Sequence, residues 1–240
     1  MAGEFRRAAE VSRIVERQMR NWELARQQSA AEHAEERPGV KFYITLSREM
    51  GCRGEAIAQC LSQRLGWKCF DREILDHMAG EVRTRRRLLA MLDEWQKGWM
   101  DDVLQPLVPE GMVGRSDYFN ALTRAVLTIC HYEHAIIVGR GANFVLPPDQ
   151  GLRVRLVAPL PYRIAAVARA EGLDEGEAKK RIDQIEGRRA KFVAAHYGRF
   201  PYDPRNYDVV LNTASFSDEQ ACELIVAAAR SKPASENVSL

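Results

Sequence analysis

The sequence predicts an α/β fold built on a parallel sheet with helices on both faces. Apolar, strand-like runs alternate with helix-period segments along most of the 240 residues. The first strand-like run enters a loop with two glycines and continues into a helix, which is a common unit of such sheets. Hydrophobic residues make up 46% of the chain, enough for a packed core.

A charged helical segment, residues 5–36, comes before the first predicted strand. Met19 and Trp22 fall near helical spacing within it, and a Pro-Gly pair follows it. Because the segment precedes the core, we interpret residues 1–38 as an N-terminal helical extension. Two roles stay open for it: association with a protein partner or a second copy, and packing against its own domain.

The core, residues 39–231, is predicted to alternate strands and helices. Its elements in chain order are strand 41–46, loop 47–54, helix 54–65, strand 67–70, helix 117–132, strand 134–138, loop 139–151, strand 153–158, helix 160–170, helical stretch 174–197, strand 207–211 and helix 217–231. Residues 72–115 form an irregularly helical insertion, and residues 232–240 form a flexible polar tail. This topology predicts ligands at the carboxyl ends of the strands.

Charge and cysteine content argue against several functional classes. The chain has 35 basic and 33 acidic residues, and this near balance disfavours a nucleic-acid-coating protein. Five cysteines without a C-x-x-C pair indicate reduced thiols. Neither a signal peptide nor a membrane-length apolar run is visible, so we predict a cytoplasmic protein without a membrane partner.

The loop after the first strand is a candidate phosphate-binding loop. Its residues are Ser47, Arg48, Glu49, Met50, Gly51, Cys52, Arg53, Gly54 and Glu55. Backbone N–H groups at a helix N-terminus bind phosphate well. The usual lysine is absent: Arg53 falls near its position, and Glu55 falls near that of the magnesium-binding hydroxyl. The alternatives are an ordinary strand-to-helix turn and, for Cys52, either a reactive thiol or a small filler residue.

A second candidate lies just after the strand at 134–138. Arg140 stands between Gly139 and Gly141, at an edge of the sheet where ligands bind. The flanking glycines allow close approach of a ligand, and the arginine fork matches phosphate oxygens, so Arg140 is the strongest single phosphate candidate. The alternative is a structural turn with a surface arginine.

Basic residues also gather in two helical regions. One cluster lies at 83–87, and the other comprises Arg181, Arg188, Arg189 and Lys191. Seven or eight residues make about two helical turns, so several of the second group share one face. Both clusters suit phosphate, although solvated helix faces are the alternative. The spacing of acidic, cysteine and histidine residues predicts no metal site.

Taken together, these segments resemble the cytidylate kinase-like family of the P-loop nucleoside-monophosphate kinase superfamily. The resemblance covers about residues 40–230. It lies mainly in residues 44–51 (ITLSREMG), 70–75 (FDREIL), 137–143 (IVGRGAN), 186–192 (EGRRAKF) and 203–213 (DPRNYDVVLNT). This family generally lacks the P-loop lysine. The chain departs further from it where Cys52-Arg53 replace the usual Ser-Gly and Glu55-Ala56 replace Arg-Glu.

The resemblance implies a P-loop NTPase-like kinase core that uses ATP and Mg²⁺. It implies phosphoryl transfer from a nucleoside triphosphate to a nucleoside monophosphate or another small acceptor, with 72–115 as the acceptor-binding insertion and 174–205 as a lid. The implied donor-binding residues are Ser47, Arg48, Glu49, Gly51, Cys52, Gly54 and Glu55. The implied catalytic residues are Arg53, Arg140, Arg181 and Arg189. The implied acceptor-binding residues are Asp71, Arg72, Gly139 and Gly141.

Two alternatives remain at this stage. Asp71 follows the second predicted strand, and it suits the N-cap of a helix as well as it suits an acceptor site. The altered phosphate loop leaves open a catalytically degenerate member that binds nucleotide or phosphate as an interaction or regulatory module.

Overall fold

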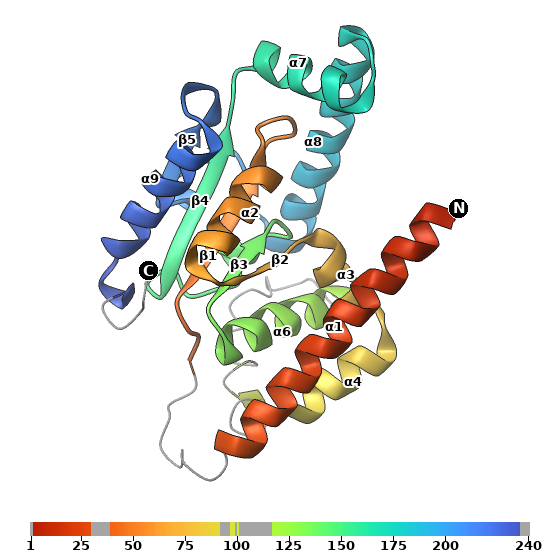
Figure 1. Cartoon of the computed structure of the whole chain (residues 1–240), viewed down its shortest axis with the longest axis vertical. Helices are drawn as coiled ribbons and strands as arrows, with labels where there is room; N and C mark the ends of the chain where they lie inside the picture. The colour runs from red at the N-terminus through yellow and green to blue at the C-terminus, as the bar shows by residue number, and fades with distance from the viewer. Residues whose placement is uncertain (1, 30–38, 92–96, 99, 101–116, 236–240) are drawn as a thin grey trace. The chain divides into compact units, whose positions relative to one another are not determined.

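The computed structural model describes residues 2–29, 39–91, 97–98, 100 and 117–235 (Figure 1). Two compact units are present: residues 1–41 with 71–133, and residues 42–70 with 134–240. Much of the predicted insertion, the end of the predicted first helix and the last five residues lie outside the described residues. The predicted domain boundaries therefore stay a prediction.

The first unit is helical. It contains α1 (Ala2–Ser29), α3 (Arg72–Gly80), α4 (Val82–Met91) and α6 (Asp117–Tyr132). Helix α1 contacts both α3 and α4, and it buries Val15, Met19 and Trp22. The Trp22 ring stacks on that of Tyr132 at a centroid distance of 5.9 Å. These contacts show α1 packing within its own unit, while association through α1 stays a prediction.

The second unit contains a sheet of five parallel strands, which confirms the predicted fold class. The strands are β1 (Tyr43–Arg48), β2 (Lys68–Phe70), β3 (Ala135–Val138), β4 (Gly151–Val157) and β5 (Val209–Asn212), in the order β2-β3-β1-β4-β5. Strand β1 extends two residues beyond the predicted end because Ser47 and Arg48 still pair with β4. The phosphate-loop candidate therefore begins on a strand at the centre of the sheet.

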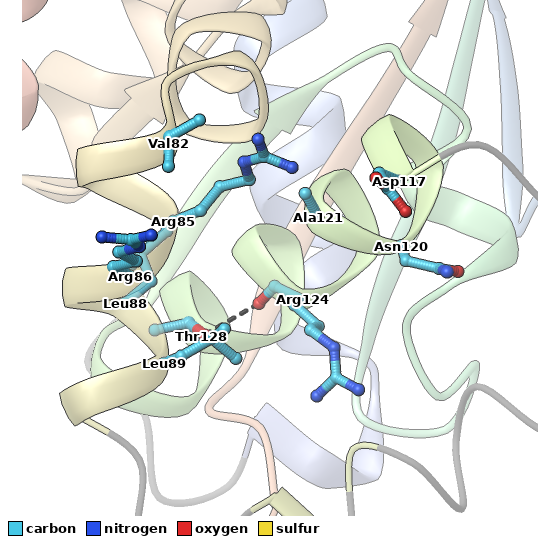
Figure 2. A pocket seen from close by; sticks show the side chains of 10 residues that line it. All are labelled: Val82, Arg85, Arg86, Leu88, Leu89, Asp117, Asn120, Ala121, Arg124 and Thr128. Atoms are coloured by element: carbon cyan, nitrogen blue, oxygen red, sulfur yellow. Dashed lines mark hydrogen bonds between the residues drawn. The ribbon is translucent and has the colours of Figure 1, made fainter.

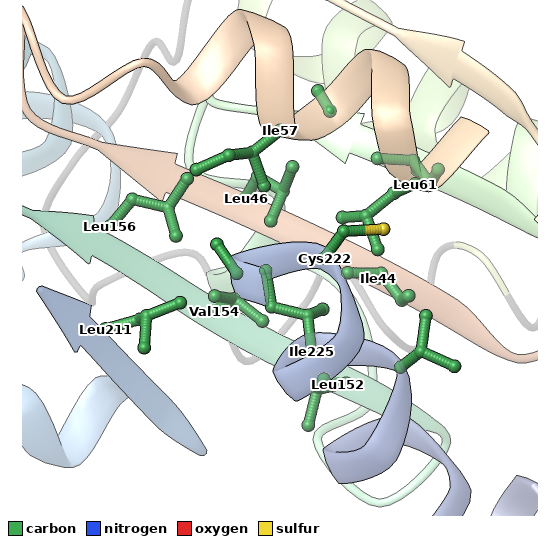
Figure 3. Close-up of a cluster of buried hydrophobic side chains, with 14 of the residues drawn as sticks. Ile44, Leu46, Ile57, Leu61, Leu152, Val154, Leu156, Leu211, Cys222 and Ile225 are labelled. Carbon is green, nitrogen blue, oxygen red and sulfur yellow. The ribbon is translucent and has the colours of Figure 1, made fainter. Parts of the chain in front are cut away.

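The described residues of this unit form four α-helices. They are α2 (Gly54–Leu65), α7 (Leu160–Glu171), α8 (Glu175–Tyr197) and α9 (Asp218–Arg230). Alternate residues of β1 and β4, such as Ile44 and Val154, face α2 and α9 in one buried cluster (Figure 3). This apolar layer contains Ile57 of α2 and Ile225 of α9, and it fixes the start of α2 against the end of β1.

Helices α7 and α8 lie beyond the carboxyl end of β4 (Figure 1). Helix α8 begins with a capping box, in which Asp174 and Glu177 satisfy each other's backbone N–H groups. Val167, Ala178 and Ile182 join the two helices in a small buried cluster. No helix in the described part of the chain is long and apolar enough to cross a lipid bilayer.

Candidate phosphate-binding site

The loop between β1 and α2 has the backbone of an anion-binding turn. Gly51 and Arg53 adopt left-handed conformations, with φ of 85° and 57°. Arg53 occupies the N-cap of α2, and its side chain makes no capping hydrogen bond. The first-turn N–H groups of this 12-residue helix therefore point toward the loop without a side-chain cap.

Helix α7 lies directly against the tip of this loop. A Cβ atom on Gly51 would lie 2.7 Å from the carbonyl oxygen of Arg163, so only glycine fits there. The neighbouring Met50 side chain packs against the small cluster between α7 and α8. The loop tip is thus held by the helices that follow β4.

The side chain of Arg48 connects the loop to the Gly-Arg-Gly turn. A Cβ atom on Gly54 would lie 2.9 Å from Cγ of Arg48, and one on Gly139 would lie 2.3 Å from its Nη1. Arg48 therefore passes between these two glycines. The Arg48 side chain thus runs between Gly54, a predicted donor-binding residue, and Gly139, a predicted acceptor-binding residue.

Arg53 is directed elsewhere. Its Nη2 donates to the carbonyl oxygens of Thr213 and Phe216, and its Nη1 lies 2.9 Å from Oδ1 of Asp218. These contacts tie the start of α2 to the segment between β5 and α9. The guanidinium is committed to that segment, so a role of Arg53 at the phosphates stays a prediction without a contact that supports it.

The two carboxylates of the loop differ in their surroundings. Glu49 accepts a hydrogen bond from the backbone N–H of Ala158 (3.2 Å) and lies 3.3 Å from Nε of Arg163 and 3.7 Å from Nη2 of Arg155. Glu55 is exposed in the first turn of α2. Within the described residues, no three His, Cys, Asp or Glu side chains cluster as metal ligands. Mg²⁺ takes oxygen ligands, and Glu55 is the exposed loop carboxylate that would supply one.

Helix α8 reaches the loop through two side chains. Nη1 of Arg189 donates to the carbonyl oxygen of Arg48 (2.9 Å) and to Oε1 of Glu186 (2.8 Å). The same Oε1 accepts the backbone N–H of Met50 at 2.8 Å. The structure thus places the predicted Arg189 on the loop. It also brings Glu186 to the loop, a residue to which the sequence assigns no role; its spacing three residues before Arg189 is the signal that points to it.

The Gly-Arg-Gly turn is fixed by the last turns of α8. Tyr197 Oη donates to the carbonyl oxygen of Arg140 at 2.7 Å, and the Arg140 guanidinium lies 4.9 Å from the Phe192 ring centroid. Arg140 has a φ of 52°; within the described residues it and Arg53 are the only non-glycine residues with positive φ. Such strained residues concentrate at functional sites.

Three other predicted residues take structural positions. Arg181 is exposed and lies 3.3 Å from Glu171, so it joins α8 to α7. Ser47 donates to Oδ1 of Asn143 at 3.5 Å. The Cys52 thiol donates to the carbonyl oxygen of Glu49, and burial, followed by the Glu49 charge, raises its pKa to about 11. Cys52 is therefore protonated at neutral pH and fits the interpretation as a filler.

The predicted acceptor residues Asp71 and Arg72 belong to the helical unit. Asp71 caps α3, because its Oδ1 accepts the backbone N–H groups of Glu73 (2.9 Å) and Ile74 (3.0 Å). Arg72 is exposed at the first position of α3. The capping interpretation of Asp71 is thus the one that the contacts show, and binding of an acceptor by this pair stays a prediction.

The helical unit also contains a cavity of about 280 Å³ between α4 and α6 (Figure 2). Arg85 extends from α4 toward Ala121 of α6, whereas the guanidinium groups of Arg86 and Arg124 point to other sides (Figure 2). The basic cluster at 83–87 therefore divides. Arg85 and Arg86 line the cavity, and Arg87 forms an ion pair with Glu23 of α1 at 3.0 Å.

Comparison with curated proteins gives two relatives of part of this chain. A curated cytidylate kinase from Methanopyrus kandleri is 36% identical over 102 residues, which are 39% of this chain and 53% of that protein. A uronate isomerase from Corynebacterium glutamicum is 34% identical over 92 residues, 38% of this chain but 18% of that protein. The chain thus spans about half the length of the first and under a fifth of the second.

A solved structure supports the fold alone. An uncharacterized protein from Eubacterium ventriosum ATCC 27560 superposes with a TM-score of 0.62 at 18% identity, over 78% of this chain and 97% of that one. The sequence profile of the cytidylate kinase-like family matches residues 43–215, which include the candidate phosphate loop, the Gly-Arg-Gly turn and α8. Because the match spans well over half of its length, this chain belongs to the cytidylate kinase-like family.

Proposed function

We propose that this protein is a phosphotransferase that moves a phosphoryl group from a nucleoside triphosphate to a small acceptor. Membership of the cytidylate kinase-like family supports a nucleotide kinase-like function. The cytidylate kinase from Methanopyrus kandleri makes a nucleoside monophosphate the first acceptor to test. The observation that carries the proposal is the contact of Arg189 with the phosphate loop.

Phosphoryl transfer needs positioning and charge neutralisation more than covalent chemistry from the protein. The loop between Gly51 and Glu55 offers backbone N–H groups at the positive end of α2. Two guanidinium groups lie next to this loop: Arg189 of α8 donates to the carbonyl oxygen of Arg48, and the side chain of Arg48 passes Gly54 and ends at Gly139. A phosphate chain bound here would meet N–H donors on one side and guanidinium groups on the other.

The remaining predicted residues take subordinate roles in this proposal. Arg140 would contact a phosphate from the Gly-Arg-Gly turn, and Asp71 and Arg72 would contribute to acceptor binding. Arg181 would act as a lid residue. ATP would supply the phosphoryl group, and Mg²⁺ would supply positive charge to its phosphates, with Glu55 as the loop carboxylate that would hold the ion.

The test is a phosphoryl-transfer assay with Mg·ATP and each nucleoside monophosphate, read by chromatography of ADP and the diphosphate product. Arg189→Ala should lower kcat/KM by about 10²–10³-fold, because arginines that neutralise transferring phosphate carry at least this much. Arg188→Ala is the matched control, since it removes the same charge from an exposed position next in sequence. Equal rates in the two variants would remove Arg189 from the site.

A second candidate function is a non-catalytic module that binds nucleotide. Two contacts favour it: Arg53 donates to a carbonyl oxygen of the β5–α9 segment, and Glu49 forms an ion pair with Arg163. The same assay separates the two functions when it is paired with thermal unfolding. A rise in melting temperature with Mg·ATP and no product from any acceptor favours the module, whereas product formation excludes it.

A further inference from the structure

The contact between Glu186 and the phosphate loop places a carboxylate on a loop N–H group. Oε1 of Glu186 lies 2.8 Å from the Met50 nitrogen and 2.8 Å from Nη1 of Arg189. The Glu186 side chain is 15% exposed, so water screens this arrangement only in part. One anionic oxygen thus holds one loop donor and one cation.

A phosphoryl oxygen at this position would accept hydrogen bonds from the same two donors, the Met50 N–H and Arg189. Backbone N–H groups of such loops and guanidinium groups are the donors that phosphate prefers, and each bond with an ionised acceptor is strong. The Met50 N–H cannot serve Glu186 and a phosphoryl oxygen at full strength together. Two anions at this spacing also repel each other. The Glu186 carboxylate and a phosphoryl oxygen therefore cannot occupy this position at the same time.

We propose that Glu186 is an internal competitor for the phosphate chain, and that binding of a phosphoryl group displaces its carboxylate from Met50. The inference rests on the proposed function and extends it to regulation of the same site. Displacement gives Arg189 a phosphate oxygen in place of the carboxylate. The loop N–H and the arginine then act on the ligand together, so binding and the supply of a positive charge are linked.

The same exchange selects among ligands. A ligand must offer enough negative charge at Met50 to replace a carboxylate that already holds both donors. A polyphosphate chain that reaches this position meets the requirement better than a single phosphate lying deeper on the α2 N-terminus. The ligand class is therefore a triphosphate, as a nucleotide or as inorganic tripolyphosphate.

The experiment measures binding without turnover. Isothermal titration calorimetry with inorganic tripolyphosphate, and separately with Mg·ATP, compares wild type with Glu186→Ala and Glu186→Gln. We expect about tenfold or greater tightening for Glu186→Ala, because a competing charge-assisted bond is lost. Glu186→Gln should tighten binding less, since its amide oxygen still accepts the Met50 N–H.

Asp183→Asn is the matched control. Asp183 is exposed, carries the same charge and lies one turn earlier on α8, so its variant corrects for the general change in net charge. The affinity of the Asp183→Asn variant for each ligand should stay within about twofold of that of wild type. Removing Arg189 in the Glu186→Ala background should abolish most of the gain.

The outcomes separate this inference from the proposed function. If tripolyphosphate and Mg·ATP bind both Glu186 variants as tightly as wild type, or more weakly, then Glu186 supports the loop. Either result would overturn the competitor role. Absence of binding to wild type and all variants would instead overturn the proposed function. If Glu186→Ala does not fold, the result with Glu186→Gln decides alone.

Discussion

Gly141 offers the sharpest test of how the Gly-Arg-Gly turn depends on α8. Its φ of 69° lies in the left-handed region, and a Cβ atom there would lie 2.2 Å from the Tyr197 ring. Tyr197 is buried, and its hydroxyl donates to the Arg140 carbonyl oxygen. Gly141→Ala must therefore strain the backbone and also push Tyr197 away from the turn.

The size of the effect follows from these two terms. An alanine in the left-handed region costs about 1–2 kcal/mol. Displacing Tyr197 loses a part-buried hydrogen bond worth about 0.5–1.5 kcal/mol, together with some packing. We therefore expect Gly141→Ala to lower the free energy of unfolding by about 2–4 kcal/mol.

Gly172 provides a matched control for the backbone term. It has the same φ of 69° after α7, but no atom lies within 4 Å of a Cβ built there. Gly172→Ala should therefore cost only the left-handed strain, about 1–2 kcal/mol. Urea unfolding followed by circular dichroism gives both values on one scale.

A double-mutant cycle then isolates the clash. With Tyr197→Ala present, Gly141→Ala should cost no more than Gly172→Ala, because the ring that blocks the Cβ is gone. Equal costs for Gly141→Ala and Gly172→Ala in the wild-type background would refute the reasoning. They would mean that the turn and α8 separate easily.

Two further predictions concern stability. Burial by itself would raise the pKa of Asp208. Hydrogen bonds from Arg153 and the positive charges of Arg153 and Lys232 outweigh burial and lower that pKa below its ordinary value. Asp208→Asn should therefore lower the free energy of unfolding by about 1–3 kcal/mol at pH 7, and this difference between the variant and wild type should shrink as pH falls below about 4. Urea unfolding midpoints measured between pH 7 and pH 3 test this. A difference that is independent of pH would contradict the ionic role of Asp208. The Met19 side chain is 1% exposed, so Met19→Ala should lower the free energy of unfolding by about 2–5 kcal/mol. A loss below about 1 kcal/mol in urea unfolding would show that α1 does not pack firmly on its unit.

Much of the sheet could be predicted because its signals are local. Helix 54–65 was predicted with its observed bounds, since Gly54 and Gly66 stand at its two ends and apolar residues recur between them. The start of α8 is equally local, because Asp174 and Glu177 form its capping box. Strand ends were less accurate: pairing with β4 decides where β1 stops, and the sequence of β1 does not report it.

The chemistry of the loop was harder to predict, because its partners are distant in the sequence. Arg53 binds carbonyl groups 160 and 163 residues later, and Met50 binds a carboxylate 136 residues later. A register based on the loop alone therefore placed Arg53 where the usual lysine would stand. The Gly-Arg-Gly turn and Arg189 could be singled out as candidates, since glycine pairs and arginines at helical spacing are visible in the sequence, and their part in phosphate binding stays a prediction.

The positive charge beside the candidate phosphate loop therefore depends on tertiary contacts as well as on the loop sequence. Arg53, the basic residue nearest the position of the usual lysine, fastens α2 to the β5–α9 segment. The Arg48 side chain passes Gly54 and ends at Gly139, because neither glycine has a Cβ atom to block it. Arg189 reaches the loop because α8 lies against it. If a phosphate chain binds on this loop as proposed, we expect any change that moves α8 to weaken its binding, because such a change would move Arg189 away from the loop.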